Sequence, residues 1–171
     1  MNSQPPTSTL LLREPNASQS HLTFLYAGDI WVADRDGSHP KRLTVHAGIK
    51  ASPHFSPDGA WIAYSAGSYE RAISVYVVPV QGGTPSKLTH HPGHDWVQGW
   101  TPDGEKVLFS STRSSSSPRF TRFFTIARTG GFPELLPLPM AYRGAFSPDG
   151  TKLAYTRLYE PFRTWKRYRG G

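Results

Sequence analysis

The sequence repeats itself with a period of about 45 residues, and this repeat restricts the fold more than any other feature. Three segments share an aromatic residue, a Ser or Thr, Pro-Asp-Gly and then a run of apolar residues: FSPDGAWIAYSA (55–66), WTPDGEKVLFSS (100–111) and FSPDGTKLAYTR (146–157). Their aspartates, Asp58, Asp103 and Asp149, lie 45 and 46 residues apart. A second marker keeps the same spacing, because KRLTVH (41–46) and SKLTHH (86–91) are also 45 residues apart.

Each Pro-Asp-Gly element predicts a tight turn between two antiparallel strands. Proline presets φ, aspartate bonds to nearby backbone, and glycine accepts a positive φ. We therefore interpret the recurring aspartates as turn residues rather than as a repeated ion site. The first repeat lacks the element, and its hairpin corner is expected at Asn16–Gln19.

The strand after each turn is apolar at successive positions, in residues 61–65, 107–109 and 153–155. Such a strand is expected to be buried on both faces. The last strand of a repeat, in residues 41–44 and 86–89, is polar and follows a proline, which is typical of an outer edge. One repeat is thus four short strands, as in a β-propeller blade of roughly 40–45 residues.

The predicted fold is all-β, an incomplete β-propeller of three blades and the start of a fourth. The expected boundaries are an N-terminal tail at 1–9 and blades at 10–47, 48–93, 94–140 and 141–171. Closed propellers need roughly 4–8 blades. We therefore expect these residues to be the N-terminal part of a longer polypeptide, with an oligomer of open fragments as the alternative.

Composition excludes several functions for this stretch. There is no cysteine, so disulfides and Cys-ligated metals are excluded. No signal peptide or membrane span is recognisable, which predicts a cytoplasmic chain with no membrane partner. G-x-S-x-G, H-E-x-x-H and phosphate-binding glycine motifs are absent. We expect no catalytic residue, no metal site and no cofactor here.

Three further segments carry a family resemblance: GDIWVADRDGSHPKRLTVHAG (28–48), HHPGHDWVQGWTPDG (90–104) and FRTWKRYRGG (162–171). The turn element alone is shared with TolB-type propellers and with those of prolyl oligopeptidase-like peptidases. Together with these segments, the sequence resembles the first propeller of tricorn-type proteases from about Leu10 onward.

This resemblance implies a large cytoplasmic serine peptidase that degrades oligopeptides. Its propellers serve as gates or channels, and its catalytic side chains lie in a peptidase core beyond this stretch. The expected partners are the remaining blades and that core, peptide substrates, and further copies in a homo-oligomer. The alternative is a non-enzymatic interaction scaffold of the TolB kind.

Three basic groups are candidates for peptide contact. His90, His91 and His94 precede Asp95 in a loop, where we favour contact with anionic peptide ends over metal binding. Arg113 and Arg119 flank a Ser-rich loop. Lys166, Arg167 and Arg169 belong to a stretch, 157–171, with five basic side chains against one acidic. Its interleaved aromatics also suit single-stranded nucleic acid. We do not favour that partner, because much of the net charge of +7 is confined to this one segment.

Overall fold

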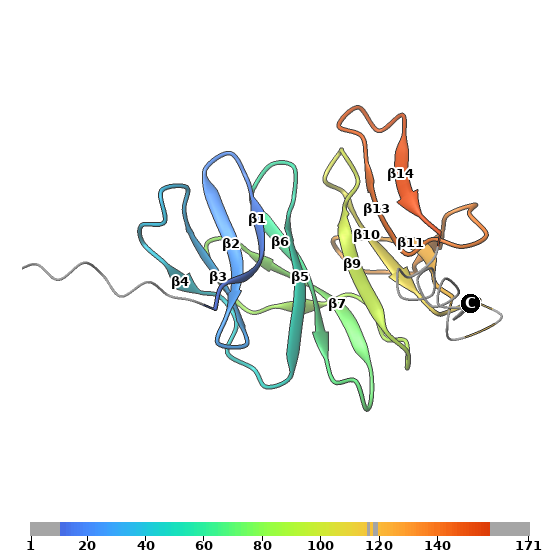
Figure 1. Cartoon of the computed structure of the whole chain (residues 1–171), viewed down its shortest axis with the longest axis horizontal. Helices are drawn as coiled ribbons and strands as arrows, with labels where there is room; N and C mark the ends of the chain where they lie inside the picture. Colours follow the sequence, from blue (N-terminus) through green and yellow to red (C-terminus); the bar gives the residue numbers. More distant parts are fainter. Residues whose placement is uncertain (1–10, 116, 118–119, 158–171) are drawn as a thin grey trace, which may run out of the picture.

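The computed structural model describes residues 11–115, 117 and 120–157. All regular structure within these residues is β-strand, in three four-stranded antiparallel sheets and one two-stranded hairpin (Figure 1). No helix in the described part of the chain is long and apolar enough to cross a membrane. The all-β prediction is confirmed.

Each sheet is built from strands that follow one another in sequence. The first sheet contains β1 (Arg13–Ala17), β2 (His21–Tyr26), β3 (Asp29–Asp34) and β4 (Lys41–Arg42). The second contains β5 (Ile49–Phe55), β6 (Trp61–Gly67), β7 (Ile73–Pro79) and β8 (Ser86–Lys87). The third contains β9 (Asp95–Trp100), β10 (Lys106–Ser111), β11 (Arg122–Ala127) and β12 (Glu134–Leu135). The hairpin pairs β13 (Arg143–Phe146) with β14 (Leu153–Thr156).

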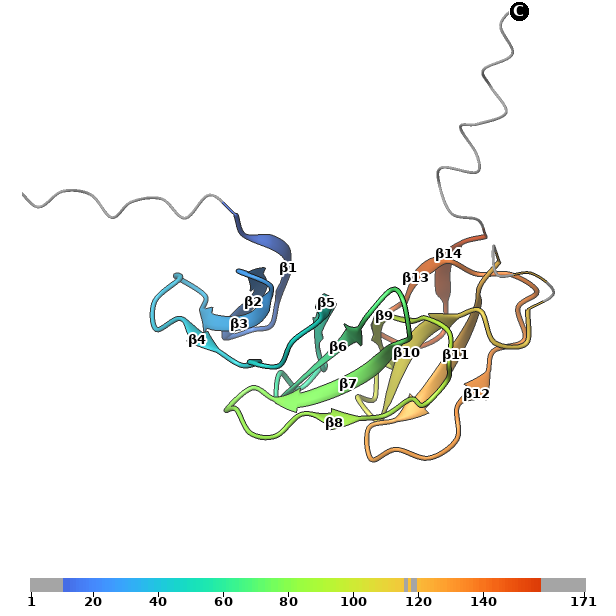
Figure 2. The ribbon, with the colours of Figure 1, turned by 90° about the horizontal axis from the view of Figure 1, so that it is seen from below.

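The sheets stand side by side along an open arc. Figure 2 shows the first strand of each sheet, β1, β5, β9 and β13, on the concave side of the arc. The last strands, β4, β8 and β12, lie on the opposite side, and each consists of two exposed residues. This arrangement is an incomplete β-propeller, as the 45-residue period predicts. The residue boundaries assigned to the blades remain predictions, because the sheets do not show how a loop between two blades is to be divided between them.

The Pro-Asp-Gly turns have the geometry that their chemistry predicts. The N–H of Gly59 donates to the carbonyl of Ser56 over 2.8 Å, and Gly59 has φ +70°. The Asp58 carboxylate accepts bonds from the Ser56 hydroxyl and the Ala60 N–H, which together lower its pKa. Asp103 and Asp149 make the same pair of contacts in their turns. The recurring aspartates are therefore turn residues.

The second sheet contributes side chains to two hydrophobic cores. Ile62, Tyr64 and Val78 point toward the first sheet and pack with Leu25, Ile30 and Val32. Ala63, Val75 and Val77 point the other way and pack with Val97, Phe109 and Ile126 of the third sheet. Alternate residues of β6 and β7 face different neighbours. β6 is buried from Ile62 to Ala66, as predicted for the strand after the turn, and β7 is buried except at Tyr76 and Pro79.

Two local predictions are wrong. Asn16 lies within β1, opposite Thr23, and the first corner is formed by residues 18–20 because the β1–β2 pairing extends to Ala17. Leu153–Tyr155 forms a strand as expected, but Ala154 and Tyr155 are exposed. The described residues place only β13 beside β14, so no further sheet covers its second face.

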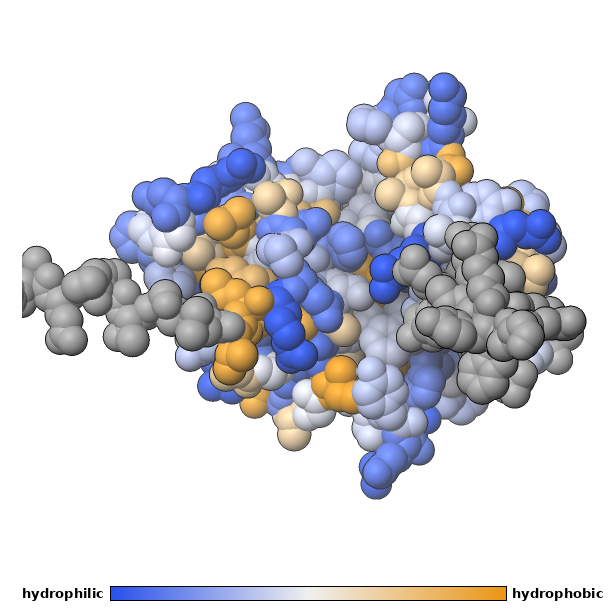
Figure 3. Space-filling view, viewed as in Figure 1, coloured by the Kyte–Doolittle hydropathy of each residue, from blue (hydrophilic) through white to orange (hydrophobic). Residues whose placement is uncertain are grey.

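The opposite end of the arc also presents an apolar face. Alternate residues of β2 and β3 line a groove of about 400 Å³, with Leu22, Phe24, Tyr26, Trp31 and Ala33 on its walls. Hydrophobic residues gather over this sheet in Figure 3. The first sheet is therefore apolar on both faces, like the second, although only one of its faces is covered by a described sheet.

Two buried carboxylates lie at the junctions between strands. The Asp29 carboxylate, on β3, is 3.0 Å from the Lys50 ammonium on β5 and also accepts bonds from Arg42 and Thr44. Burial raises its pKa, but these three donors outweigh burial and hold the pKa below its ordinary value. The Asp95 carboxylate, fully buried at the start of β9, pairs with the Arg113 guanidinium at 2.5 Å. That guanidinium also lies over the rings of Phe109 and Phe124.

We predict that Arg113→Met destabilises the chain by about 3 kcal/mol or more, because it leaves the Asp95 charge buried without a partner. The free energy of unfolding in urea measures the loss. Lys106→Met is the matched control, since it removes an exposed ion pair with Glu134 and should cost less than about 1 kcal/mol. Equal losses in the two variants would contradict this account of the Asp95 contact.

Candidate functional site

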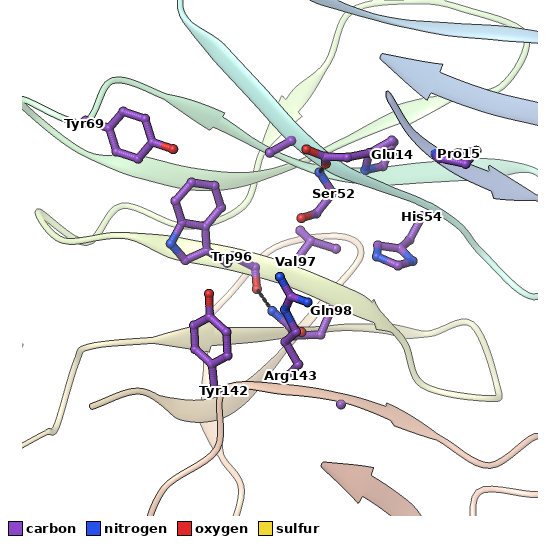
Figure 4. Close-up of a pocket in the computed structure, with 13 residues that line it drawn as sticks. Glu14, Pro15, Ser52, His54, Tyr69, Trp96, Val97, Gln98, Tyr142 and Arg143 are labelled. Atoms are coloured by element: carbon purple, nitrogen blue, oxygen red, sulfur yellow. Dashed lines mark hydrogen bonds between the residues drawn. The ribbon is translucent and has the colours of Figure 1, made fainter. Parts of the chain in front are cut away.

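A cavity of about 630 Å³ lies at the inner strands, on the concave side of the arc. It is lined by residues of all four inner strands and of the β6–β7 loop: Glu14, Pro15, Ala51, Ser52, Pro53, His54, Tyr69, Trp96, Val97, Gln98, Tyr142, Arg143 and Gly144. We call this surface the inner wall. Figure 4 shows its side chains converging from segments far apart in the sequence.

Bulges in the inner strands shape the inner wall. The pairing of β1 with β2 is interrupted between Arg13 and Asn16, and that of β5 with β6 between Ala51 and His54. At the bulges, Glu14 and Ser52 have φ of 50° and 52°, a left-handed conformation that is costly for residues other than glycine. The bulge frees the Ser52 N–H from the ladder, and this N–H donates to the Glu14 carboxylate.

One side of the inner wall is aromatic. The Tyr69 ring, 65% exposed, lies 6.0 Å from Trp96 and 6.1 Å from His94, measured between centroids. In Figure 4 Tyr69, Trp96 and Tyr142 follow one another along this side. Such rings offer flat apolar surface with polar tips, which suits peptide side chains.

The other side of the inner wall carries polar groups. Glu14, Ser52, His54, Gln98 and Arg143 lie along it in Figure 4. The Gln98 amide donates to the Trp96 carbonyl and the Ser110 hydroxyl, each over 3.2 Å. Burial lowers the pKa of His54, whose carbonyl also accepts a 2.9 Å bond from the Trp100 indole. The His54 imidazole is therefore neutral at pH 7. The bond from Trp100 to its carbonyl links β9 to β5.

The structure separates the candidate residues that the sequence groups together. His94 packs against the aromatic side of the inner wall, and its Nδ1 has no described hydrogen-bond partner. His90 and His91 lie in the same loop but do not line the cavity, and His91 accepts a bond from the Gly93 N–H. Arg113 forms an ion pair with the buried Asp95. Its role in peptide contact stays a prediction.

The remaining candidates, Arg119, Lys166, Arg167 and Arg169, lie outside the described residues. Among the described residues, no three His, Cys, Asp or Glu side chains come close enough together to hold a metal ion. His90, His91 and His94 thus form no such group with Asp95.

Sequence reasoning missed Glu14, Ser52, Gln98, Tyr142 and Arg143. A positional signal was available for four of them. Ser52, Gln98, Tyr142 and Arg143 lie two to four residues before the aromatic residue that opens each repeat marker, where the inner strand must run. Glu14 has no such marker, because the first repeat lacks Pro-Asp-Gly.

Comparison with known proteins agrees with this architecture. The family described as the tricorn protease N-terminal beta propeller domain matches residues 9–171. Tricorn protease homolog 1 of Streptomyces coelicolor is 32% identical over 166 residues, which cover 97% of this chain and 15% of that protein. The crystal structure of the tricorn protease superposes with a TM-score of 0.71 at 23% identity, covering 82% of this chain and 14% of that one. TolB from Acinetobacter baumannii superposes with a TM-score of 0.70 at 20% identity, covering 85% and 37%.

The fold and its inner wall therefore define a β-propeller portion. More specifically, the chain belongs to the family of tricorn protease N-terminal propeller domains. It spans about 15% of the length of the Streptomyces relative.

We predict that His54 makes the chain less stable in mild acid. The unfolded state protonates a histidine near pH 6.5, whereas burial keeps folded His54 neutral to lower pH. The free energy of unfolding should therefore fall as the pH decreases below about 6.5. Urea unfolding at about pH 7.5 and 5.5 measures this fall, which should be smaller in His54→Gln. An equal fall in both proteins would contradict the prediction.

Proposed function

We propose that this chain is the N-terminal propeller part of a tricorn-like serine peptidase and that its inner wall belongs to a channel that admits or guides oligopeptides. The chain itself carries no catalysis. The observation that supports this role most is the cavity of about 630 Å³ along four inner strands, in a chain of the tricorn N-terminal propeller family. Its volume is within the roughly 300–1,000 Å³ of typical ligand sites.

The chemistry of the inner wall suits an extended peptide. A peptide needs partners for its backbone N–H and C=O groups as well as surface for its side chains. Ser52, Gln98 and Arg143 offer hydroxyl, amide and guanidinium groups, and Tyr69, Trp96 and Tyr142 offer aromatic surface. Because these groups come from several inner strands, a peptide lying along the arc could contact more than one blade.

The proposed partners follow from the family. They are the remaining blades that complete the propeller, a peptidase core in the same polypeptide, peptide substrates and further copies of the parent in a homo-oligomer, all in the cytoplasm. Among the candidates for peptide contact, His94 adjoins the inner wall directly. Arg119, Lys166, Arg167 and Arg169 remain candidates for peptide contact.

A second candidate function is a non-enzymatic interaction scaffold of the TolB kind. The superposition on TolB favours it, because this propeller architecture also occurs in a protein that is not named as a protease. In that case the loops at the rims of the arc, rather than the inner wall, would bind a protein partner.

The test uses oligopeptides that carry a photoreactive phenylalanine analogue. We predict that irradiation attaches them to the inner strands β1, β5, β9 and β13, and that no peptide is hydrolysed even at high protein concentration. Mass spectrometry of the digested chain locates the attachment sites. Attachment confined to the outer strands would contradict the channel role, and hydrolysis that survives repurification would contradict the absence of catalysis.

A further inference from the structure

We propose that Arg143 binds a carboxylate of the guided peptide while the neighbouring rings hold an aromatic or apolar side chain next to it. This inference rests on the proposed channel role and adds the class of peptide that the inner wall prefers. Two observations carry it: the charge state of the inner wall and the position of its aromatic side chains relative to Arg143.

Arg143 is the positively charged residue of the inner wall that can bind an anion. It lies on β13 and is exposed, and its guanidinium points into the cavity in Figure 4. No ion pair joins it to any residue in the described part of the chain; its guanidinium lies 5.7 Å from the centroid of the Tyr142 ring. A guanidinium that is not engaged in an ion pair can form two parallel hydrogen bonds to a carboxylate.

The other ionisable groups of the inner wall do not offset this charge at Arg143. Glu14, on β1, is the acidic residue of the lining, and its carboxylate accepts the Ser52 N–H on the side of the cavity away from Arg143. His54 is held neutral by burial. An incoming anion therefore meets a guanidinium that has no ion pair among the described residues, whereas an incoming cation meets a carboxylate that is already hydrogen-bonded.

The rings beside Arg143 determine what can flank the carboxylate. Tyr142 is its neighbour in sequence, and Figure 4 places Trp96 between Tyr142 and Tyr69. The Trp96 and Tyr69 rings meet at 45°, which leaves a tilted apolar surface along the cavity. A residue adjacent to the carboxylate would lie against this surface, and a ring there gains stacking contacts that a small side chain lacks.

The experiment compares three short peptides by isothermal titration against the 171-residue chain. The first is capped at both ends, with a glutamate between two tyrosines. The second is identical except for glutamine in place of the glutamate. The third contains the glutamine and a free C-terminus, so it distinguishes a terminal carboxylate from a side-chain carboxylate.

We expect at least one carboxylate peptide to bind roughly tenfold more tightly than the capped glutamine peptide, with a preference that weakens at higher salt. Preference for the glutamate peptide identifies an acidic side chain as the ligand, and preference for the free C-terminus identifies the chain end. Arg143→Gln should abolish the preference, and Arg143→Lys should retain part of it.

Lys152→Gln is the matched control, because it removes an exposed cation in the turn between β13 and β14, away from the cavity. It should leave the preference unchanged. If all three peptides bind equally and Arg143→Gln has no effect, the inference is wrong while the channel role stands. If none of the peptides binds, both the inference and the channel role are contradicted.

Discussion

The central strands of each blade are apolar on both faces, and the rest of the structure follows from this constraint. β6 and β7 send alternate side chains into two different cores, one shared with the first sheet and one with the third. A sheet of this kind buries its apolar surface only between two neighbours. Stacking is therefore obligatory, and each added blade presents a new apolar face, as the first sheet does with its groove of Leu22, Phe24 and Trp31.

Stacking also produces the inner wall, the surface proposed to contact peptides. Once the blades lie face to face, their first strands meet along the concave side of the arc, and bulges in β1 and β5 turn polar groups away from the ladder. The buried pair Asp29–Lys50 links β3 to β5, and the Trp100 indole links β9 to the backbone of His54. The same contacts that hold neighbouring blades together thus fix the spacing of the inner strands and the shape of the inner wall.

Much of this fold is readable from the sequence, because its turns are local. Pro-Asp-Gly specifies a hairpin wherever it occurs, and a doubly apolar run such as 61–65 specifies a central strand. Features that depend on distant residues were not predictable. Glu14 and Ser52 adopt positive φ at bulges in the pairing of β1 with β2 and of β5 with β6, and Arg113 pairs with Asp95, which lies 18 residues away in the sequence. The exposure of Tyr155 shows the same limit: an apolar pattern indicates burial only where a covering sheet is present.

The central proposal is that these blades are one part of a larger peptidase of the tricorn kind. The most direct measurement is the mass of the native protein in its source cells, detected with an antibody raised against the three complete sheets. The account predicts a band several-fold heavier than the 19.0 kDa of this chain, since the chain spans 15% of its Streptomyces relative. A band at 19.0 kDa alone would contradict it.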